Sequence, residues 1–304
     1  MSPARWLSRA LLWALALLAA GQTLSAEPAR RIISLAPFLT EIAYAAGAGE
    51  RLVGAVSYSD YPPAARELPR VGGYKKIDLE AALALKPDLV LAWESGNPPA
   101  ALEKLRALDI PVLVAEPRSF EDIALLIETV GARAGTSDTA RAEAAAFRAR
   151  LERLRQRYAA RAPVSVFYQI WHRPLMTVNG EHLISAAIRL CGGRNVFAGM
   201  RPLSATVTLE AVLDADPQAI IASGMGEARP EWLNKWRRWP WLQAVEKGHL
   251  FFIPPALIQR HSPRILEGTA RLCRQLEQVR REAAAAPANT DTSGTGPHSG
   301  DGHG

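Results

Sequence analysis

The stretch that decides the fold is LEAALALKPDLVLA, residues 79–92, because it returns 130 positions later as LEAVLDADPQAIIA, residues 209–222. In each copy a helical pattern ends before a proline, which cannot continue a helix, and an apolar run typical of a buried strand follows. A helix-to-strand unit that recurs in both halves of a chain indicates an internal repeat. The sequence therefore predicts two lobes of like fold.

Short apolar runs alternate with helical patterns on either side of both copies. In the first half strands are expected at 31–35, 51–57, 89–93 and 112–115, and helices at 40–46, 78–85, 100–108 and 120–131. Thr40, Asp78 and Ser119 stand where N-cap side chains are expected. In the second half strands are expected at 164–169, 195–197, 219–222 and 250–253, with helices beginning at His182, Thr208, Trp239 and Ser262. This alternation predicts α/β lobes with largely parallel sheets.

A long helical pattern at 136–161 separates the two halves. It is rich in Ala, Arg, Glu and Leu, and it carries large side chains at helical spacing: Phe147, Leu151, Leu154 and Tyr158. At about 1.5 Å per residue, one helix of this length can run across the back of two lobes. The alternative is an ordinary crossover helix inside a single domain, but such helices are usually shorter.

The whole pattern predicts an α/β fold of two Rossmann-like lobes with central parallel-rich sheets, joined by one long rigid helix. We expect an N-terminal lobe at 27–135, the linking helix at 136–161 and a C-terminal lobe at 162–286. A stiff connector limits opening and closing of the lobes to a small motion.

Residues 1–26 predict a secretory signal peptide. Arg5 and Arg9 supply its positive start, 11–20 its apolar stretch, and 24–26 a cleavage site of small residues. With no cysteine near the cleavage site to carry a lipid anchor, the expected product is a soluble periplasmic protein.

Residues 287–304 are mostly Gly, Ser, Thr, Asp and Pro, a composition that predicts a disordered tail. Two scattered histidines in this tail, His298 and His303, are expected to be solvated rather than to hold a metal ion.

Charge and cysteine content narrow the class of protein further. The formal net charge is +6, and removal of Arg5 and Arg9 with the signal peptide leaves +4. The basic residues are spread along helical patterns, so no nucleic-acid partner is expected. Cys191 and Cys273 are the only cysteines, and in an oxidising compartment such a pair is expected to form a disulfide. Two buried free thiols are the alternative.

Motifs for catalysis and for resident metal ions are missing from the sequence, so neither an enzyme nor a metal site is predicted. There is no phosphate loop, no dinucleotide-binding glycine pattern, no nucleophile elbow and no zinc-binding HExxH. The histidines of the predicted folded part are scattered and expected to be structural: His172, His182, His249 and His261.

Aromatic residues instead follow the predicted strands. These are Tyr58, Tyr61, Tyr74, Trp93 and Trp171. Ligands of open α/β sheets bind beyond the carboxyl ends of the strands, and flat rings there suit a large, partly apolar ligand. A further cluster, Trp232, Trp236, Trp239 and Trp241, is expected mainly to pack on the second lobe.

Several stretches resemble the helical-backbone class of periplasmic binding proteins, class III, and within it the cobalamin-binding proteins of ABC importers. They are ISLAPFLTE at 33–41, SYSDYPP at 57–63, LALKPDLVLAW at 83–93, LCGGRNVF at 190–197 and SPRI at 262–265. The resemblance covers about residues 30–279. The KPDLV motif marks the class, whereas SYSDYPP together with Trp93 is more specific to cobalamin binders.

This resemblance implies a corrin-binding cleft, with cobalamin as the bound ligand rather than a catalytic cofactor. Its residues would be Tyr58, Tyr74 and Trp93 from the first lobe and Arg260 from the second. Other second-lobe positions depart from the family: a serine, Ser204, replaces a tryptophan, and Ala256 replaces an acid. Trp171 is our candidate to supply the missing aromatic contact.

The resemblance also implies partners. Glu80 and Glu210 occupy equivalent places in the repeat and match the family's docking glutamates, which meet arginines of the permease of an ABC importer with its ATPase. The alternative is that each glutamate merely favours the helix dipole.

A monomer is expected. Haem, with Tyr58, Tyr61 or His172 as axial ligand, or a ferric siderophore is the alternative ligand, and an enzyme or interaction module on the same lobes is the alternative class.

Overall fold

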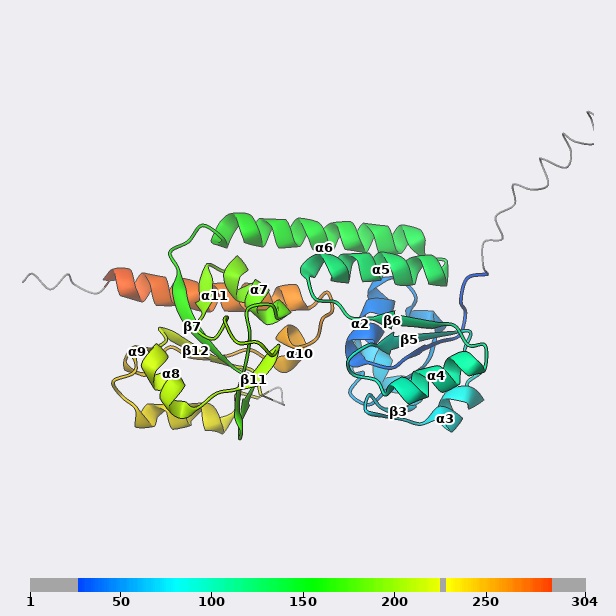
Figure 1. The fold of residues 1–304 in the computed structure, drawn as a ribbon. Coiled ribbons are helices and arrows are strands. Elements are labelled where there is room, and N and C mark those ends of the chain that lie inside the picture. Colours follow the sequence, from blue (N-terminus) through cyan, green and yellow to red (C-terminus); the bar gives the residue numbers. More distant parts are fainter. Residues whose placement is uncertain (1–26, 225–227, 286–304) are drawn as a thin grey trace, which may run out of the picture.

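The computed structural model describes residues 27–224 and 228–285 (Figure 1). The predicted signal peptide and the predicted tail lie outside these residues. Within the described part, no helix is long and apolar enough to cross a membrane.

Two four-stranded parallel sheets form the centres of the two halves, which confirms the predicted fold class. The first has the order β2-β1-β5-β6, built from β1 (Ile32–Ser34), β2 (Leu52–Ala55), β5 (Leu89–Trp93) and β6 (Val112–Ala115). The second has the order β10-β7-β12-β13, built from β7 (Val164–Gln169), β10 (Gly193–Asn195), β12 (Ala219–Ala222) and β13 (Leu250–Phe252). All pairings in both sheets are parallel, and the buried central strands carry the apolar runs that the sequence shows.

The repeated sequence has the same backbone in both halves. Helix α3 (Leu79–Ala84) leads to β5, and α8 (Leu209–Ala215) leads to β12. Asp78 caps the first helix and Thr208 the second, each accepting a hydrogen bond from a backbone N–H three residues on. After both helices the residue before the proline turns into the left-handed region, at φ 48° for Lys86 and 36° for Asp216. The internal repeat is therefore structural as well as sequential.

The remaining elements surround these sheets. In the first half they are α2 (Pro37–Ala45), η1 (Gly49–Arg51), η2 (Pro63–Glu67), β3 (Gly72–Gly73), β4 (Lys76–Ile77), α4 (Pro99–Ala107) and α5 (Phe120–Ala134). In the second half they are β8 (Trp171–His172), β9 (Leu175–Val178), α7 (Leu183–Leu190), β11 (Ser204–Thr206), the 3₁₀ helix η3 (Glu231–Arg238), α9 (Gln243–Glu246), α10 (Pro255–Ile258) and α11 (Ile265–Ala285).

One predicted cap is wrong. Ser119 caps α5 in a full capping box with Asp122, but Thr40 lies inside α2, which begins at Pro37 and has no capping side chain. Proline is well placed in a first helical turn because its missing N–H would have no helical partner there. The Thr40 hydroxyl instead bonds Ser34 at 2.9 Å and Ser59 at 3.0 Å, and so ties α2 to the ends of two strands.

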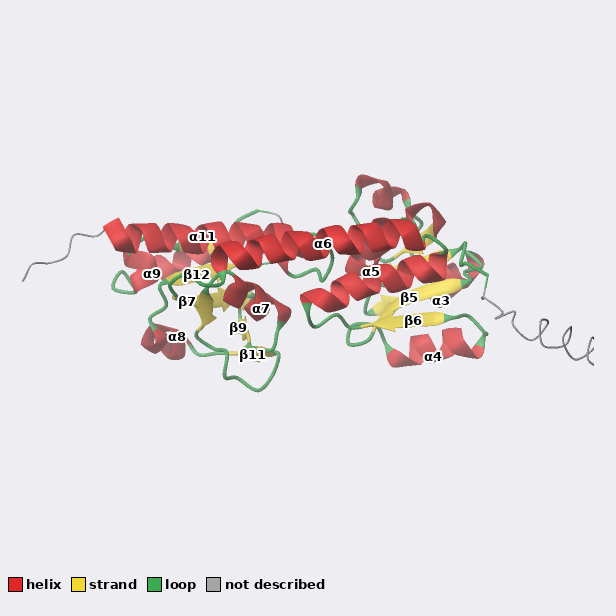
Figure 2. Cartoon of the chain, turned by 90° about the horizontal axis from the view of Figure 1, so that it is seen from above, coloured by secondary structure: helices red, strands yellow, loops and turns green. Residues whose placement is uncertain are grey.

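Helix α6 (Ser137–Tyr158) joins the halves. Its 22 residues extend about 33 Å along one side of both sheets (Figures 1 and 2). It packs on α5 in the first half and on α7 and α11 in the second, so buried residues of both halves form one continuous core. The long connecting helix is confirmed, while the lobe boundaries stay a prediction.

The predicted disulfide is present. Cys191, at the end of α7, bonds Cys273 of α11 with 4.7 Å between the Cα atoms. Closing a loop across 82 positions restricts the unfolded chain by about 4 to 5 kcal/mol on the chain-entropy model. The bond links α11 to α7, which packs beside the second sheet. The alternative of two free thiols is wrong.

Candidate ligand-binding site

Residues from both halves meet at the carboxyl ends of the strands. The loop after β2 carries Tyr58, Ser59 and Asp60, and the loop between α10 and α11 carries Arg260 and Ser262. These two loops are about 200 residues apart in the chain, yet Arg260 hydrogen-bonds both Asp60 and the Tyr58 carbonyl. The end of each sheet that binds ligands in open α/β folds therefore faces the other half.

Two of the predicted aromatic residues form a pair. The ring centroids of Tyr74 and Trp93 are 5.7 Å apart, and Phe38 meets Trp93 edge-on at 5.8 Å. The indole N–H of Trp93 points to a carboxylate oxygen of Glu116 at 3.4 Å. Directly behind the indole lies Gly96, where a Cβ atom would approach the ring to 1.9 Å. Only glycine fits there, so the backbone fixes the place of the Trp93 ring.

Asn97 holds this pair, and the sequence analysis missed it. Its side chain is buried, accepts from the Trp93 backbone N–H at 2.6 Å and donates to the carbonyls of Tyr74 at 3.0 Å and Leu35 at 2.9 Å. One amide thus joins three strand-end segments. A polar residue shortly after a strand was the available signal, but its partners meet only in three dimensions.

Tyr58 is the most exposed of the predicted ligand-binding residues. Its exposed fraction is 76 %, and its backbone is left-handed at φ 65°, a conformation that costs a non-glycine residue energy. A tyrosine held in this way packs little surface against its own chain. Its ring is available to a ligand.

Arg260 lies at the junction as predicted, but it contacts the first half directly. Its guanidinium bonds Glu41 at 2.9 Å, Asp60 at 2.6 Å and the Tyr58 carbonyl at 3.0 Å. Arg264 of the same loop lies over the ring of Tyr61 at 3.9 Å, a cation–π contact.

Glu41 is the second residue that the sequence analysis missed. Its carboxylate is buried, and this burial raises its pKa overall, although the hydrogen bonds from Ser262 and Arg260 and the charges of Arg260 and Arg264 act in the opposite direction. Two guanidinium groups and one hydroxyl are directed at it, and all three favour the charged form. Its neighbours on α2 include Phe38, Leu39 and Ile42, so the helix looked like a plain core helix in the sequence.

The structure places Trp171 elsewhere. Its ring packs on His172 at 4.9 Å, and its N–H donates to the Arg173 carbonyl at 2.9 Å in the β8–β9 hairpin. His172 in turn stacks on Trp232 at 5.4 Å. In residues 27–224 and 228–285, the ring contacts of Trp171 therefore lead to the tryptophan cluster rather than to Tyr74 and Trp93.

The tryptophan cluster mainly packs, as expected. Trp236 is buried, donates to Gln169 at 2.8 Å and contacts Phe167 and Trp239 at 5.7 Å. Trp241 is the exception, with an exposed fraction of 68 %.

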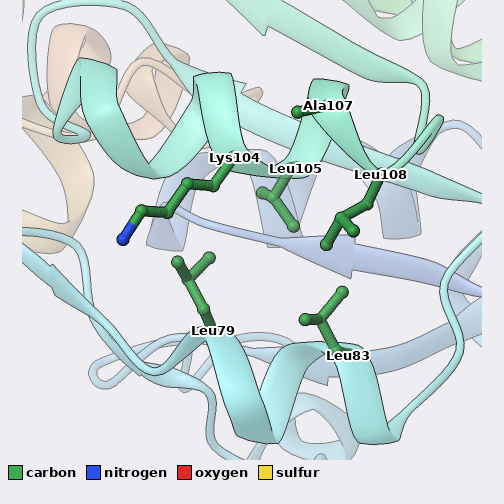
Figure 3. Close-up of a pocket in the computed structure, with 6 residues that line it drawn as sticks. All are labelled: Leu79, Leu83, Lys104, Leu105, Ala107 and Leu108. Atoms are coloured by element: carbon green, nitrogen blue, oxygen red, sulfur yellow. The ribbon is translucent and has the colours of Figure 1, made fainter.

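Two hollows lie beside the repeated helices rather than at the junction. One of about 290 Å³ lies between α3 and α4 and is mostly apolar, with Leu79, Leu83, Leu105 and Leu108 facing one another and Lys104 at its edge (Figure 3). The other, about 320 Å³, adjoins the tryptophan cluster and the start of α8. Hollows of this size suit a side chain or a small molecule rather than a large ring system.

The two predicted docking glutamates are exposed. Glu80 and Glu210 lie in the first turns of α3 and α8. In Figure 1 these helices lie at the lower ends of the two lobes, on the side away from α6. The two helices that carry these glutamates thus lie on the same side of the molecule.

The histidines near the junction hold loops. His182 accepts from the backbone N–H of Ile184 at 3.1 Å as the N-cap of α7, which requires a neutral ring. Burial, with a smaller effect of His261, lowers its pKa to about 4. His261 donates from Nδ1 to the Pro117 carbonyl at 2.8 Å, another contact between the halves, and burial lowers its pKa also. Among the described residues, no group of three His, Cys, Asp or Glu side chains is arranged to hold a metal ion.

Comparison with known proteins agrees with this architecture. The family model described as periplasmic binding protein matches residues 32–257. The chain is a member of the periplasmic binding protein family. This periplasmic binding protein is 39 % identical over 256 residues to the vitamin B12-binding protein of Vibrio cholerae, covering 84 % of the chain and 92 % of the relative. It is 37 % identical over 267 residues to that of Yersinia pestis, covering 84 % and 90 %.

Solved structures give the same result. The periplasmic vitamin B12 binding protein of Vibrio cholerae superposes with a TM-score of 0.76 at 38 % identity, over 84 % of this chain and 99 % of that one. A periplasmic haem-binding protein from Roseiflexus superposes with a TM-score of 0.72 at 23 % identity, over 82 % and 98 %. The second similarity is one of fold alone.

The low pKa of His182 makes a pH-dependent contribution to stability. An unfolded histidine takes up its proton near pH 6.5, whereas folded His182 does so only near pH 4. The unfolded chain therefore binds more protons between these values, and stability is lost as the pH falls through them. His182→Asn keeps a capping acceptor but does not titrate. From about pH 7 to about pH 4.5 the variant should lose less stability than the wild type does. The difference between the two losses in free energy of unfolding should reach up to about 3 kcal/mol.

Urea unfolding of both proteins at the two pH values measures this difference. Equal losses of stability would contradict the assignment.

Proposed function

We propose that this protein captures cobalamin, or a related corrinoid, in the periplasm and delivers it to an ABC importer of the inner membrane. The observation that carries the proposal is the set of flat side chains at the junction of the halves. Tyr74 and Trp93 form a fixed pair, and Tyr58 leaves 76 % of its surface exposed beside Arg260. The naming of relatives at 37 to 39 % identity as vitamin B12-binding proteins supports the same ligand.

The chemistry of these residues suits a corrin. Its ring is broad and partly apolar, which matches the faces of Tyr58, Tyr74 and Trp93. Its rim carries amide groups that accept and donate hydrogen bonds. Arg260 can donate to the amide oxygens. We assign the ligand contacts to Tyr58, Tyr74, Trp93 and Arg260, and keep Trp171 as a weaker candidate because its indole N–H is already bonded within its own hairpin.

Haem is the alternative ligand that one observation favours. The phenol of Tyr58 is exposed, as an axial ligand to iron has to be. A ferric siderophore would call for several free cations, whereas Arg260 and Arg264 are both directed at Glu41. Cobalamin is therefore compared with haem in the test below.

The wider role follows from the family. We propose that residues 1–26 export the chain, that it acts as a monomer without catalysis, and that its lobes, 27–135 and 162–286, move little about the linking helix 136–161. The transporter partners would be the permease and its ATPase. Glu80 and Glu210 would contact arginines on the permease, because both are exposed, occupy equivalent places in the repeat and belong to helices on the side away from α6.

Isothermal titration with cyanocobalamin tests the ligand. We expect saturable one-to-one binding, weakened about tenfold or more by Trp93→Ala, since loss of a stacked aromatic contact costs about 0.5 to 1.5 kcal/mol and the lost buried area adds to this cost. Trp241→Ala removes an equally large but unrelated exposed ring and should leave the affinity unchanged. If the protein bound haemin but not cyanocobalamin, its ligand would be haem and the cobalamin proposal would be wrong.

ATP hydrolysis by proteoliposomes that hold the permease and ATPase tests the docking residues. Glu80→Gln with Glu210→Gln should reduce ligand-dependent ATP hydrolysis several-fold, and more strongly at low ionic strength, while cyanocobalamin affinity stays constant. Glu152→Gln, on the opposite side in α6, is the control and should change neither. If the double variant kept the wild-type rate of ligand-dependent ATP hydrolysis, the two glutamates would only favour the dipoles of their own helices.

A further inference from the structure

A buried carboxylate joins the two halves. Glu41 belongs to α2 of the first half, and only 2 % of its side chain is exposed. Three partners reach it from one loop of the second half: the Ser262 hydroxyl donates to Oε2 at 2.6 Å, Arg260 donates to Oε1 at 2.9 Å, and Arg264 approaches Oε1 to 3.6 Å. The chain separation is about 220 residues, so the contact fixes one half relative to the other.

Nothing in the packing of α2 requires a charge at this position. Apart from Thr40, the flanking buried residues of the helix are apolar, and an apolar side chain would avoid the cost of removing a carboxylate from water. A buried ion pair of this kind is weak evidence for stability, but its directional hydrogen bonds fix geometry closely. Glu41 is thus better explained by the placement of its partners than by the stability of the first half.

Arg260 has an inner and an outer set of contacts. The inner contact is to buried Glu41, and the outer contacts are to Asp60, whose side chain is 48 % exposed, and to the carbonyl of exposed Tyr58. Water reaches the outer set but scarcely reaches the inner one. A ligand that enters beside Tyr58 can therefore replace the outer contacts while the inner contact remains.

We propose that Glu41 is a positioning residue that holds Arg260 between the lobes and directs it toward an incoming ligand. We call the contacts of Glu41 with Arg260, Ser262 and Arg264 the clasp. In the free protein Asp60 and the Tyr58 carbonyl occupy the outward-facing donors of Arg260. Polar groups of the ligand take their place on binding, and Glu41 keeps the guanidinium in position throughout. The ligand step rests on the proposed function, whereas the clasp between the halves does not.

The two carboxylates on Arg260 then have opposite effects on affinity. Glu41→Gln removes the charge that positions Arg260 and should weaken cyanocobalamin binding about tenfold. Asp60→Asn removes a competitor of the ligand for the same guanidinium, so it should leave affinity unchanged or tighten it a few-fold. In an Arg260→Ala background, Glu41→Gln should have less than about a twofold effect, because its action runs through Arg260.

A merely structural Glu41 would give a different result. Its substitution would weaken binding by the same factor with or without Arg260, and such additivity would overturn the positioning role. Weakening by Asp60→Asn to the same extent as by Glu41→Gln would also overturn it.

A second measurement needs no ligand. Nitroxide labels at Arg106 in α4 and Asp214 in α8, both exposed, report the distance between the halves by pulsed electron resonance. Glu41→Gln should broaden or lengthen the distance distribution, and Asp60→Asn should not. If Glu41→Gln fails to fold, Ser262→Ala with Arg264→Ala removes two partners from the other side and should give the same broadening.

An unchanged distance distribution in these variants would overturn the clasp. Absence of cyanocobalamin binding by the wild type would refute the proposed function alone, because the distance measurement would still decide whether Glu41 joins the halves.

Discussion

The apolar stripe along α6 packs on α5 in the first half and on α7 and α11 in the second, so the two sheets share one continuous core. The relative position of the sheets is thereby limited from one side. At the other side, the loops after the strands are joined chiefly by the polar contacts of Arg260 and Ser262 with Glu41, and by the rings of Tyr61 and Phe38, which meet Arg264 and His261. Apolar packing thus sets the frame, and a small number of directional contacts set the geometry of the site.

The same division explains where the binding residues can lie. Because both faces of each sheet are buried, a ligand can reach the sheets only at their strand ends. Helix α6 covers one side of both halves, so the ligand has to approach from the other side. The segments that carry the rings are fixed, because Asn97 bonds the backbone N–H of Trp93 and the backbone carbonyl of Tyr74, and Gly96 lies against the Trp93 indole. Fixed rings lose little freedom when a ligand stacks on them, which favours tight binding without a large closing motion.

Much of the fold could be predicted because its signals are local. The repeated helix-to-strand unit, the caps Asp78 and Ser119 and the cysteine pair each depend on a few neighbouring residues or on compartment chemistry. Two residues were misjudged or missed because their partners come from other elements and meet them only in the fold. Thr40 bonds Ser34 and Ser59 instead of capping a helix, and Glu41 looks like part of a core helix until Arg260 and Ser262 reach it. Trp171 follows a strand as a ligand residue would and is held by its own hairpin and by His172, so its contact with a ligand stays a prediction.

A crystal structure of the mature protein with cyanocobalamin tests the central claim most directly. Our account predicts the corrin at the junction of the halves, in contact with Tyr58, Tyr74 and Trp93, with Arg260 bonded to both the ligand and Glu41. A corrin bound in the hollow beside Trp232, or at the junction without contact to Trp93, would contradict it.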